Sequence, residues 1–128
     1  MPYPYDPQNV FAKILRGEIP NKTVLDTEHC LAFEDIAPQA PCHVLVIPKG
    51  AYVNADDFAA RASDAEILDF TRAVGAVCQA AGVTPDGGGG GYRLIANSGE
   101  AAVQEVPHYH VHVLGGRPLG RMLARADG

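Results

Sequence analysis

The chain has 128 residues, of which 47% are hydrophobic and 20% charged, and its net charge is −5. These values are typical of a single soluble globular domain covering residues 1–128, large enough to bury a core without disulfides or a structural metal. Lysines and arginines are scattered, which argues against a nucleic-acid groove, although local geometry can still hold one nucleotide.

The cysteines and the N-terminus bear on the compartment. Cys30, Cys42 and Cys78 are odd in number and widely spaced, without a paired metal-ligand spacing. Reduced thiols in a cytoplasmic protein are the simplest interpretation. The N-terminal residues lack the basic and apolar pattern of a signal peptide, and no apolar run reaches membrane-spanning length. We therefore expect a cytoplasmic protein without a membrane partner.

The first half of the chain predicts a short helix and three strands. The helix is expected to begin at Asp6-Pro7, because Asp6 can cap it and proline suits its first position, and to end at Gly17. Its apolar face contains Val10, Phe11, Ile14 and Leu15. The strands are expected at residues 22–25, 30–35 and 43–48. Since the connections are too short for parallel crossovers, the strands should form an antiparallel meander.

The second half predicts the main helix and two more strands. Ser63-Asp64-Ala65-Glu66 is a capping-box sequence, and apolar residues at helical spacing follow it as far as Gly82. The glycine run at residues 87–91 lacks the Lys-Ser or Lys-Thr of a P-loop and is expected to be a connector. Strands are expected at residues 92–96 and 108–114, separated by a loop and followed by an irregular tail at residues 117–128. This order predicts an α+β fold, an antiparallel sheet of about five strands with two helices.

The strongest chemical signal is the stretch His108-Tyr109-His110-Val111-His112-Val113-Leu114. Alternate residues of a strand share a face, so the three histidines would point one way and the residues between them into a core. A helix would not align them, because residues two apart on a helix do not face each other. Imidazole is a titratable group, a nucleophile and a metal ligand. The residues alone leave open a metal site, metal-free nucleophilic chemistry, or a structural row of histidines.

The same stretch resembles the signature of the histidine-triad (HIT) nucleotide hydrolases and transferases. Other blocks are similar in the same order, namely Phe11-Ala12-Lys13-Ile14 and residues 16–20, 31–41, 43–49, 91–97 and 115–119. The similarity is diffuse between about residues 51 and 90, and Gly115-Gly116-Arg117-Pro118 resembles the Hint branch. The resemblance implies a HIT-like fold and a metal-independent purine nucleoside phosphoramidase without a cofactor. Such an enzyme hydrolyses adenosine or guanosine 5′-phosphoramidates to the nucleoside monophosphate and an amine. It also implies a homodimer whose sheets join across the interface.

The resemblance assigns roles to four histidines. His110 matches the nucleophile, which would attack the α-phosphorus and form a nucleotidyl-histidine that water then cleaves. His112 would assist the leaving group or orient a phosphate oxygen, and His108 would orient the row. His43 matches a histidine that hydrogen-bonds near the nucleophile and fixes its tautomer. Without the resemblance, His43 would be interpreted as a structural polar residue at the start of a strand.

Nucleotide-binding roles follow from the same resemblance. Asp35 matches an acid that accepts hydrogen bonds from both ribose hydroxyls, although by itself it would be interpreted as a turn-forming residue. The expected base pocket consists of Val10, Phe11, Ile14, Phe33, Glu34 and Ile36. Because an apolar slot reads purine edges weakly, AMP and GMP derivatives should both be accepted. Asn97, Gln104 and Glu105 are expected on the phosphate side, by side chain or by backbone N–H.

The chain departs from the family pattern at three places. Ala102-Val103 stands where many Hint-like members have two glycines, so side chains there would restrict the approach of the backbone to a phosphate. Glu105 stands where other members carry a serine, and we expect its carboxylate to turn away from the phosphate or to pair with a cation. Ala12 stands where some members have a zinc-binding cysteine, so no structural zinc is expected.

Three other functions remain open at this point. One is a dinucleoside polyphosphate hydrolase, which a comparison of substrates would identify. Another is a nucleotide-binding or partner-binding module whose hydrolysis is vestigial, which would bind nucleotide without turnover. The last is a histidine-based metalloenzyme, which would lose its activity in a chelator.

Overall fold

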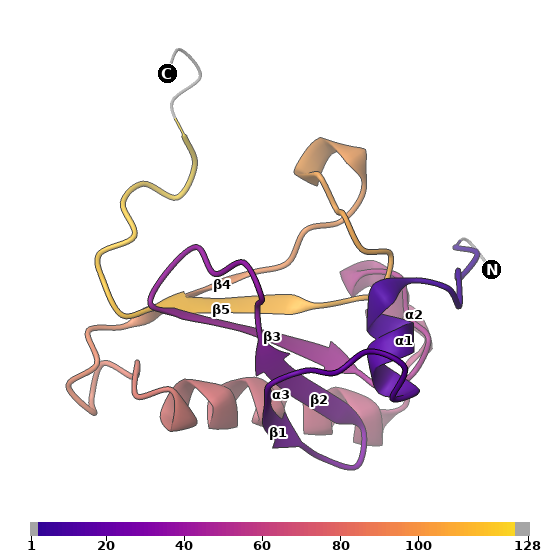
Figure 1. The fold of residues 1–128 in the computed structure, drawn as a ribbon, viewed down its shortest axis with the longest axis horizontal. Helices are drawn as coiled ribbons and strands as arrows, with labels where there is room; N and C mark the ends of the chain where they lie inside the picture. Colours follow the sequence, from indigo (N-terminus) through magenta and orange to yellow (C-terminus); the bar gives the residue numbers. More distant parts are fainter. Residues whose placement is uncertain (1–2, 125–128) are drawn as a thin grey trace.

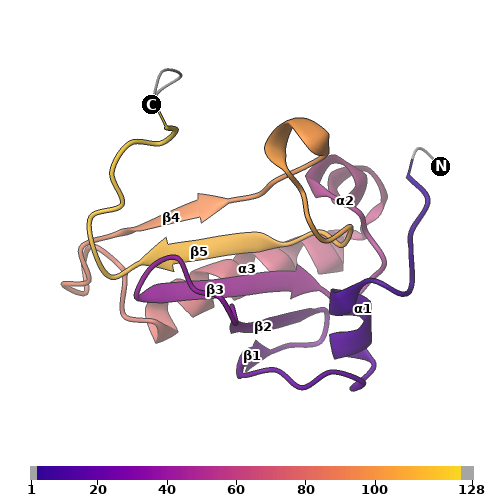
Figure 2. The same cartoon turned by 45° about the horizontal axis from the view of Figure 1, so that its top comes forward.

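The computed structural model describes residues 3–124 as one antiparallel sheet with helices on both of its faces (Figure 1). The strands are β1 (Thr23–Asp26), β2 (Cys30–Glu34), β3 (Cys42–Pro48), β4 (Tyr92–Ile95) and β5 (Val111–Gly115). The helices are α1 (Val10–Leu15), α2 (Ala55–Arg61) and α3 (Asp64–Ala80), with a 3-10 turn, η1, at Glu100–Ala102. The strand order is β1-β2-β3-β5-β4, so β5 lies between β3 and β4 (Figure 2). The predicted α+β class, the five-stranded antiparallel sheet and the meander β1-β2-β3 are confirmed.

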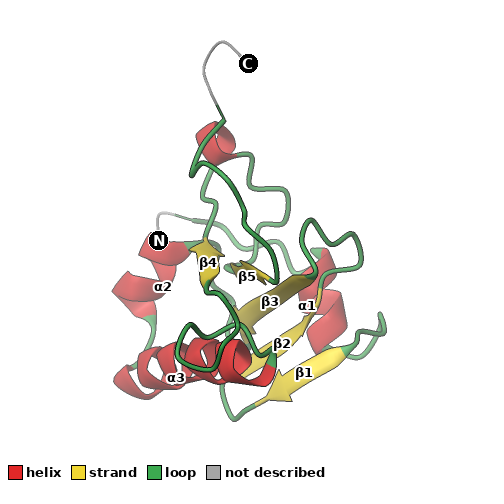
Figure 3. Ribbon diagram, turned by 90° about the vertical axis from the view of Figure 1, so that its left-hand side faces the viewer, coloured by secondary structure: helices red, strands yellow, loops and turns green. Residues whose placement is uncertain are grey.

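The larger core lies between the sheet and α3. Val44 and Val46 of β3 and Val111 and Val113 of β5 point toward this helix, because alternate strand residues share a face. They meet α3 side chains that include Phe70 and Val77. The helix begins at the predicted capping box, in which Ser63 and Glu66 each satisfy the other's backbone N–H. Figure 3 shows α2 and α3 together on one side of the sheet and α1 on the other.

A smaller core lies on the opposite face, beneath α1. Phe11 of α1 packs there against Leu31 and Phe33 of β2 and Leu45 and Ile47 of β3. The helix has only six residues, so it covers β2 and β3 but does not extend over β5. Polar side chains can therefore occupy this face of β5.

The start of α1 differs from the prediction. The helix begins at Val10 and is capped by Asn9, whose side chain accepts a hydrogen bond from the Ala12 N–H at 2.9 Å. Asp6 instead accepts the Gln8 N–H at 2.9 Å and the Asn9 side chain on its carbonyl at 2.7 Å, which makes a turn before the helix. Both residue types cap helices well, so the local sequence did not decide between them.

The prediction of two helices missed α2. Its cap is Asn54, and a buried Asp57 pairs with Arg61 one turn later at 2.7 Å. Phe58 is the only large apolar residue in this helix, so hydrophobic periodicity gave no signal. The tail carries no helix or strand from Arg117 to residue 124, and residues 125–128 of the predicted irregular tail lie outside the described part. Within residues 3–124 no helix is both long and apolar enough to cross a membrane.

Candidate active site

The three histidines of the row lie on the α1 face of the sheet, as the alternation predicted. The Phe11 ring is 6.3 Å from the His108 ring and 5.0 Å from the His110 ring, centroid to centroid. The His110 and His112 rings are also 5.0 Å apart. Tyr109, between the first two histidines, packs in the core on the α3 face. One side of β5 and of the segment before it thus carries three imidazoles, of which His110 and His112 reach a cavity.

His108 is fully buried, and its two ring nitrogens have different partners. Nε2 is 2.8 Å from the carbonyl oxygen of Pro48, which can only accept, so Nε2 carries the proton. Nδ1 is 2.6 Å from the Tyr5 hydroxyl and therefore accepts a hydrogen bond from it. Burial lowers the pKa of His108 to about 4. The ring is therefore neutral at pH 7 with a defined tautomer.

His110 is held in the opposite tautomer by the main chain. Its Nδ1 is 2.7 Å from the backbone carbonyl of His108 and must donate to it. Burial lowers the pKa of His110, and this is partly offset by the carbonyl and by the charges of Asp35 and Glu105. The ring is therefore neutral, and its Nε2 lone pair has no hydrogen-bond partner among the described residues. A neutral imidazole with an available lone pair is a competent nucleophile.

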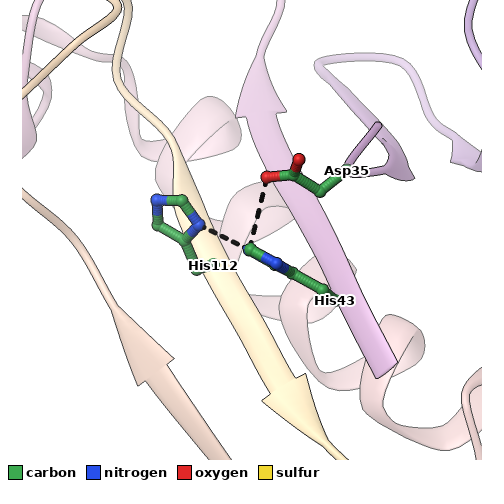
Figure 4. A group of neighbouring side chains, drawn as sticks. All are labelled: Asp35, His43 and His112. Carbon is green, nitrogen blue, oxygen red and sulfur yellow. Dashed lines mark hydrogen bonds and ion pairs between the residues drawn. The ribbon is translucent and has the colours of Figure 1, made fainter. Parts of the chain in front are cut away.

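His43 and His112 form a second pair, next to Asp35 (Figure 4). The backbone N–H of Gln39 donates to His43 Nδ1 at 3.0 Å, so the His43 proton is on Nε2. That N–H donates to His112 Nδ1 at 2.8 Å and lies 3.4 Å from Asp35 Oδ2. His112 must then carry its own proton on Nε2. Burial and the neighbouring His110 and His43 lower the pKa of His112 to about 4, so this ring is neutral as well.

This pairing corrects the expected role of His43. We predicted that His43 fixes the tautomer of the nucleophile. In the structure the carbonyl of His108 does this, and His43 bonds to His112.

The same pairing bears on the metalloenzyme interpretation. Asp35, His43 and His112 each offer one ligand atom, and these atoms lie within 4.8 Å of one another. A metal at this place needs the Nε2 lone pair of His43. The Gln39 N–H occupies the other ring nitrogen, so Nε2 of the neutral ring carries a proton and cannot bind a cation without losing that contact. The donor set does not fit a metal well.

His110 and His112 line a cavity of about 220 Å³, whereas His43 and His108 do not reach it. Seven of the predicted site residues line it, namely Phe11, Asp35, Asn97, Gln104, Glu105, His110 and His112. Val103, which we expected to restrict the approach to a phosphate, lines it too, and sequence reasoning missed Ala37, Gln39, Leu45 and Val106. Most of these are small or apolar loop and core residues, which carry no chemical signal in a sequence.

A second hollow of about 460 Å³ shares Asp35 with the first. It is lined by two predicted residues, Glu34 and the fully exposed Ile36, and by Pro20, Asn21, Lys22 and Pro38. The remaining predicted base-pocket residues line neither space. Phe33 is buried in the core beneath α1, Ile14 packs against that core, and Val10 is 39% exposed at the start of the helix.

The loop between β4 and β5 closes the cavity on one side. The Gln104 amide donates to the carbonyls of Val53 at 2.7 Å and Val106 at 3.0 Å, and its oxygen accepts the Gly99 N–H at 3.1 Å. Its side chain therefore holds the loop and is not free for a phosphate. Val103 has a φ of 56°, a left-handed backbone that is costly for a β-branched residue.

Glu105 is an exposed residue at the cavity, and its charge raises the pKa of His110. It forms no ion pair within the described part of the chain. The expected cation partner is therefore not seen among these residues, and the direction of the carboxylate stays a prediction.

Comparison with known proteins identifies the family. A model described as the HIT domain matches residues 16–119. The chain belongs to the HIT domain family. An uncharacterised 13.2 kDa HIT-like protein of Azospirillum brasilense is 62% identical over 121 residues, which are 94% of this chain and 96% of the relative. The purine nucleoside phosphoramidase of Escherichia coli K12 is 42% identical over 117 residues, 91% of this chain and 94% of the relative. The solved structure of a HIT family hydrolase of Clostridium thermocellum matches this structure with a TM-score of 0.79 and 38% sequence identity. The match covers 91% of this chain and 97% of that hydrolase chain. The predicted resemblance to HIT proteins of the Hint branch is confirmed.

Proposed function

We propose that this HIT protein is a purine nucleoside phosphoramidase that works through a nucleotidyl-histidine. The observation that carries the proposal is the state of His110, whose proton is committed to the His108 carbonyl at 2.7 Å. Nε2 of a neutral ring is thereby left as the nucleophile at the cavity. The 42% identity to the Escherichia coli enzyme of that name supports the substrate class.

The reaction divides into two displacements at phosphorus. His110 Nε2 forms a bond to the α-phosphorus, the P–N bond breaks, and the departing nitrogen takes its proton from solvent. The ring then carries a positive charge, which Asp35 and Glu105 stabilise because both already raise the pKa of His110. Water next attacks the phosphorus and gives up a proton to solvent, the bond between phosphorus and Nε2 breaks, and the nucleoside monophosphate leaves His110 in its neutral form.

His112 contributes a hydrogen bond and stays neutral. With a pKa of about 4 it is not an imidazolium at pH 7, so it is a poor source of a proton for the amine. Its Nε2–H is instead available for a phosphate oxygen, since Nδ1 is occupied by His43. Charge that develops on that oxygen strengthens the hydrogen bond in the transition state.

The two hollows suggest how the nucleotide lies. The smaller one, at the histidines, suits a phosphate, and the larger one, with Ile36 and two prolines, suits a purine. Asp35 lines both, which is the place of the ribose in a nucleotide. Its Oδ1 accepts the Ala37 N–H at 2.8 Å, so the turn-forming role is also real, and Oδ2 faces His43. Asn21, Lys22 and Glu34 share this hollow with the apolar residues, and we expect it to accept both adenine and guanine.

The test is turnover of a fluorogenic adenosine 5′-phosphoramidate in excess EDTA. The parent should release the amine, and His110→Ala should lose at least about a thousandfold in rate because the covalent route is closed. His29→Ala, a histidine of the β1–β2 turn outside the site, is the matched control and should keep the parental rate.

Three other outcomes would point elsewhere. An inert parent that still binds AMP would be a nucleotide-binding module. Faster cleavage of diadenosine polyphosphates would indicate a dinucleoside polyphosphate hydrolase. Loss of turnover in EDTA would indicate a histidine-based metalloenzyme.

We also propose a homodimer formed through β4. This strand lies at the edge of the sheet, and its Tyr92 and Leu94 are exposed. Leu94 also lines an apolar hollow between β4 and α3, together with Phe70 and Val74 of α3. An exposed apolar edge strand is a ready site for pairing with a second copy, which would join the two sheets.

A further inference from the structure

The segment before α1 makes a contact that the proposed chemistry does not yet use. The Tyr5 hydroxyl reaches His108 Nδ1 at 2.6 Å across 103 residues of sequence. The two rings also meet edge to face, with centroids 5.6 Å apart. Tyr3, two residues earlier, donates to Asp56 of α2 at 2.6 Å. The N-terminal segment is thus attached to the body of the protein at two points, one of them at the histidine row.

The proton in the Tyr5–His108 hydrogen bond has only one possible direction. His108 Nε2 faces the Pro48 carbonyl and must keep its own proton there. Nδ1 is therefore a lone pair, and Tyr5 is its donor. His108 has no exposed surface, so the Tyr5 hydroxyl is the donor that satisfies Nδ1 in the folded protein.

His108 in turn supplies the carbonyl that orients the nucleophile. The hydrogen-bonded ladder of β5 begins at Val111, so His108 lies outside it. In the segment just before β5, the chain is anchored by two hydrogen bonds. The Tyr109 N–H donates to the Tyr52 carbonyl at 2.7 Å, and the His108 side chain donates to the Pro48 carbonyl. A carbonyl that is not fixed by the sheet depends on these anchors for its direction.

We propose that Tyr5 is a positioning residue for the nucleophile. Its hydroxyl and the Pro48 carbonyl together hold the His108 ring from its two nitrogens, and the His108 carbonyl then holds His110 with Nε2 toward the substrate. This rests on the proposed function for its catalytic consequence, whereas the tautomer of His108 is a property of the free protein. Tyr5 does not line the cavity and is not assigned contact with substrate.

The test compares Tyr5→Phe with Tyr3→Phe as the matched control. Both remove one tyrosine hydroxyl from the same segment, but only the first leaves His108 Nδ1 without a donor. In Tyr5→Phe, kcat should fall about tenfold with KM within about twofold, because a misdirected nucleophile slows the chemical step and leaves binding intact. In Tyr3→Phe both constants should stay at the parental values.

Nuclear magnetic resonance of ¹⁵N-labelled histidine gives a readout that simple loss of stability does not produce. In folded Tyr5→Phe the His108 Nδ1 signal should shift downfield as its donor is lost, and the His110 ring signals should move with it. Neither should change in Tyr3→Phe. An unchanged His108 signal, unchanged kcat, or an equal loss in both variants would overturn the proposal.

The two proposals fail separately. If the parent cleaves no phosphoramidate, the proposed function fails, and the histidine signals still decide the role of Tyr5. Shifts at both His108 and His110 confined to Tyr5→Phe would support positioning. A shift at His108 without any change at His110 would refute it.

Discussion

Acidification should destabilise the protein through the burial of His108. Burial holds the pKa of this ring at about 4, whereas in the unfolded chain it is about 6.5. Between these values the unfolded state binds the extra proton, so stability is intact above about pH 6.5 and falls as the pH decreases below it. The slope approaches about 1.4 kcal/mol per pH unit. From about pH 7 to about pH 5 the loss from this single residue is about 2 kcal/mol.

The assay is urea unfolding of the parent and of His108→Gln at both pH values and at one protein concentration. Glutamine keeps an N–H for the Pro48 carbonyl but has no proton to gain. The parent should lose about 2 kcal/mol more than the variant on going from about pH 7 to about pH 5. His43, His110 and His112, whose pKa values burial also lowers, lose stability in the same window, but they are present in both proteins, so the difference isolates His108.

One result would refute the reasoning. If the parent and His108→Gln lose the same free energy of unfolding, the His108 ring does not contribute to the loss of stability in acid. The tautomer assignment for His108, which depends on a neutral ring, would then be wrong as well.

Three further predictions concern the loop, the ribose and the interface. Val103→Gly should raise the free energy of unfolding in urea by up to about 1 kcal/mol, because relief of the left-handed valine exceeds the entropy cost of glycine. Val103→Ala keeps a Cβ in the left-handed backbone and should not stabilise the protein, and a clear loss of stability in Val103→Gly would show that Val103 is not strained. Asp35→Asn should weaken AMP binding about tenfold in calorimetry and leave 2′,3′-dideoxy-AMP unchanged, since a charged acceptor is lost; equal losses for both ligands would remove Asp35 from the ribose. Leu94→Glu should give a monomer in sedimentation with the parental circular dichroism, and a persisting dimer would place the interface elsewhere.

The sequence was a good guide wherever alternation along one strand decided the outcome. The period of two placed the three histidines on one face and Val111 and Val113 on the other, and the structure confirms both, although the strand begins at Val111 and not at the predicted His108. The capping box of α3 was equally local. In these places the neighbours in sequence supply the whole physical argument.

The hydrogen-bond partners of the histidines could not be predicted, because they depend on the register between strands, and a single sequence does not specify that register. In the register of β3 against β5, His43 pairs with Leu114 and Leu45 with His112, so the His43 ring reaches His112 diagonally on one face. A shift of register would have given it another partner. The role expected for His43 therefore failed although its position in the site was expected.

Tyr5 and Gln39 were missed for a related reason. Tyr5 contacts a residue 103 positions away, and Gln39 acts through its backbone N–H, which every residue except proline carries. Neither contact can be predicted from the type of residue at that position. Only the folded chain brings these groups to the histidines.

The main chain's control of the imidazole tautomers bears on the mutational robustness of the site. The Pro48 carbonyl, the His108 carbonyl and the Gln39 N–H set the proton positions of His108, His110 and His43. Side-chain replacements at Pro48 or Gln39 leave those backbone groups in place, so the protonation pattern tolerates sequence drift around it. Gln39→Pro is the exception, since it deletes the N–H itself. A neutral-drift library of active variants should therefore accept many residues at position 39 and exclude proline.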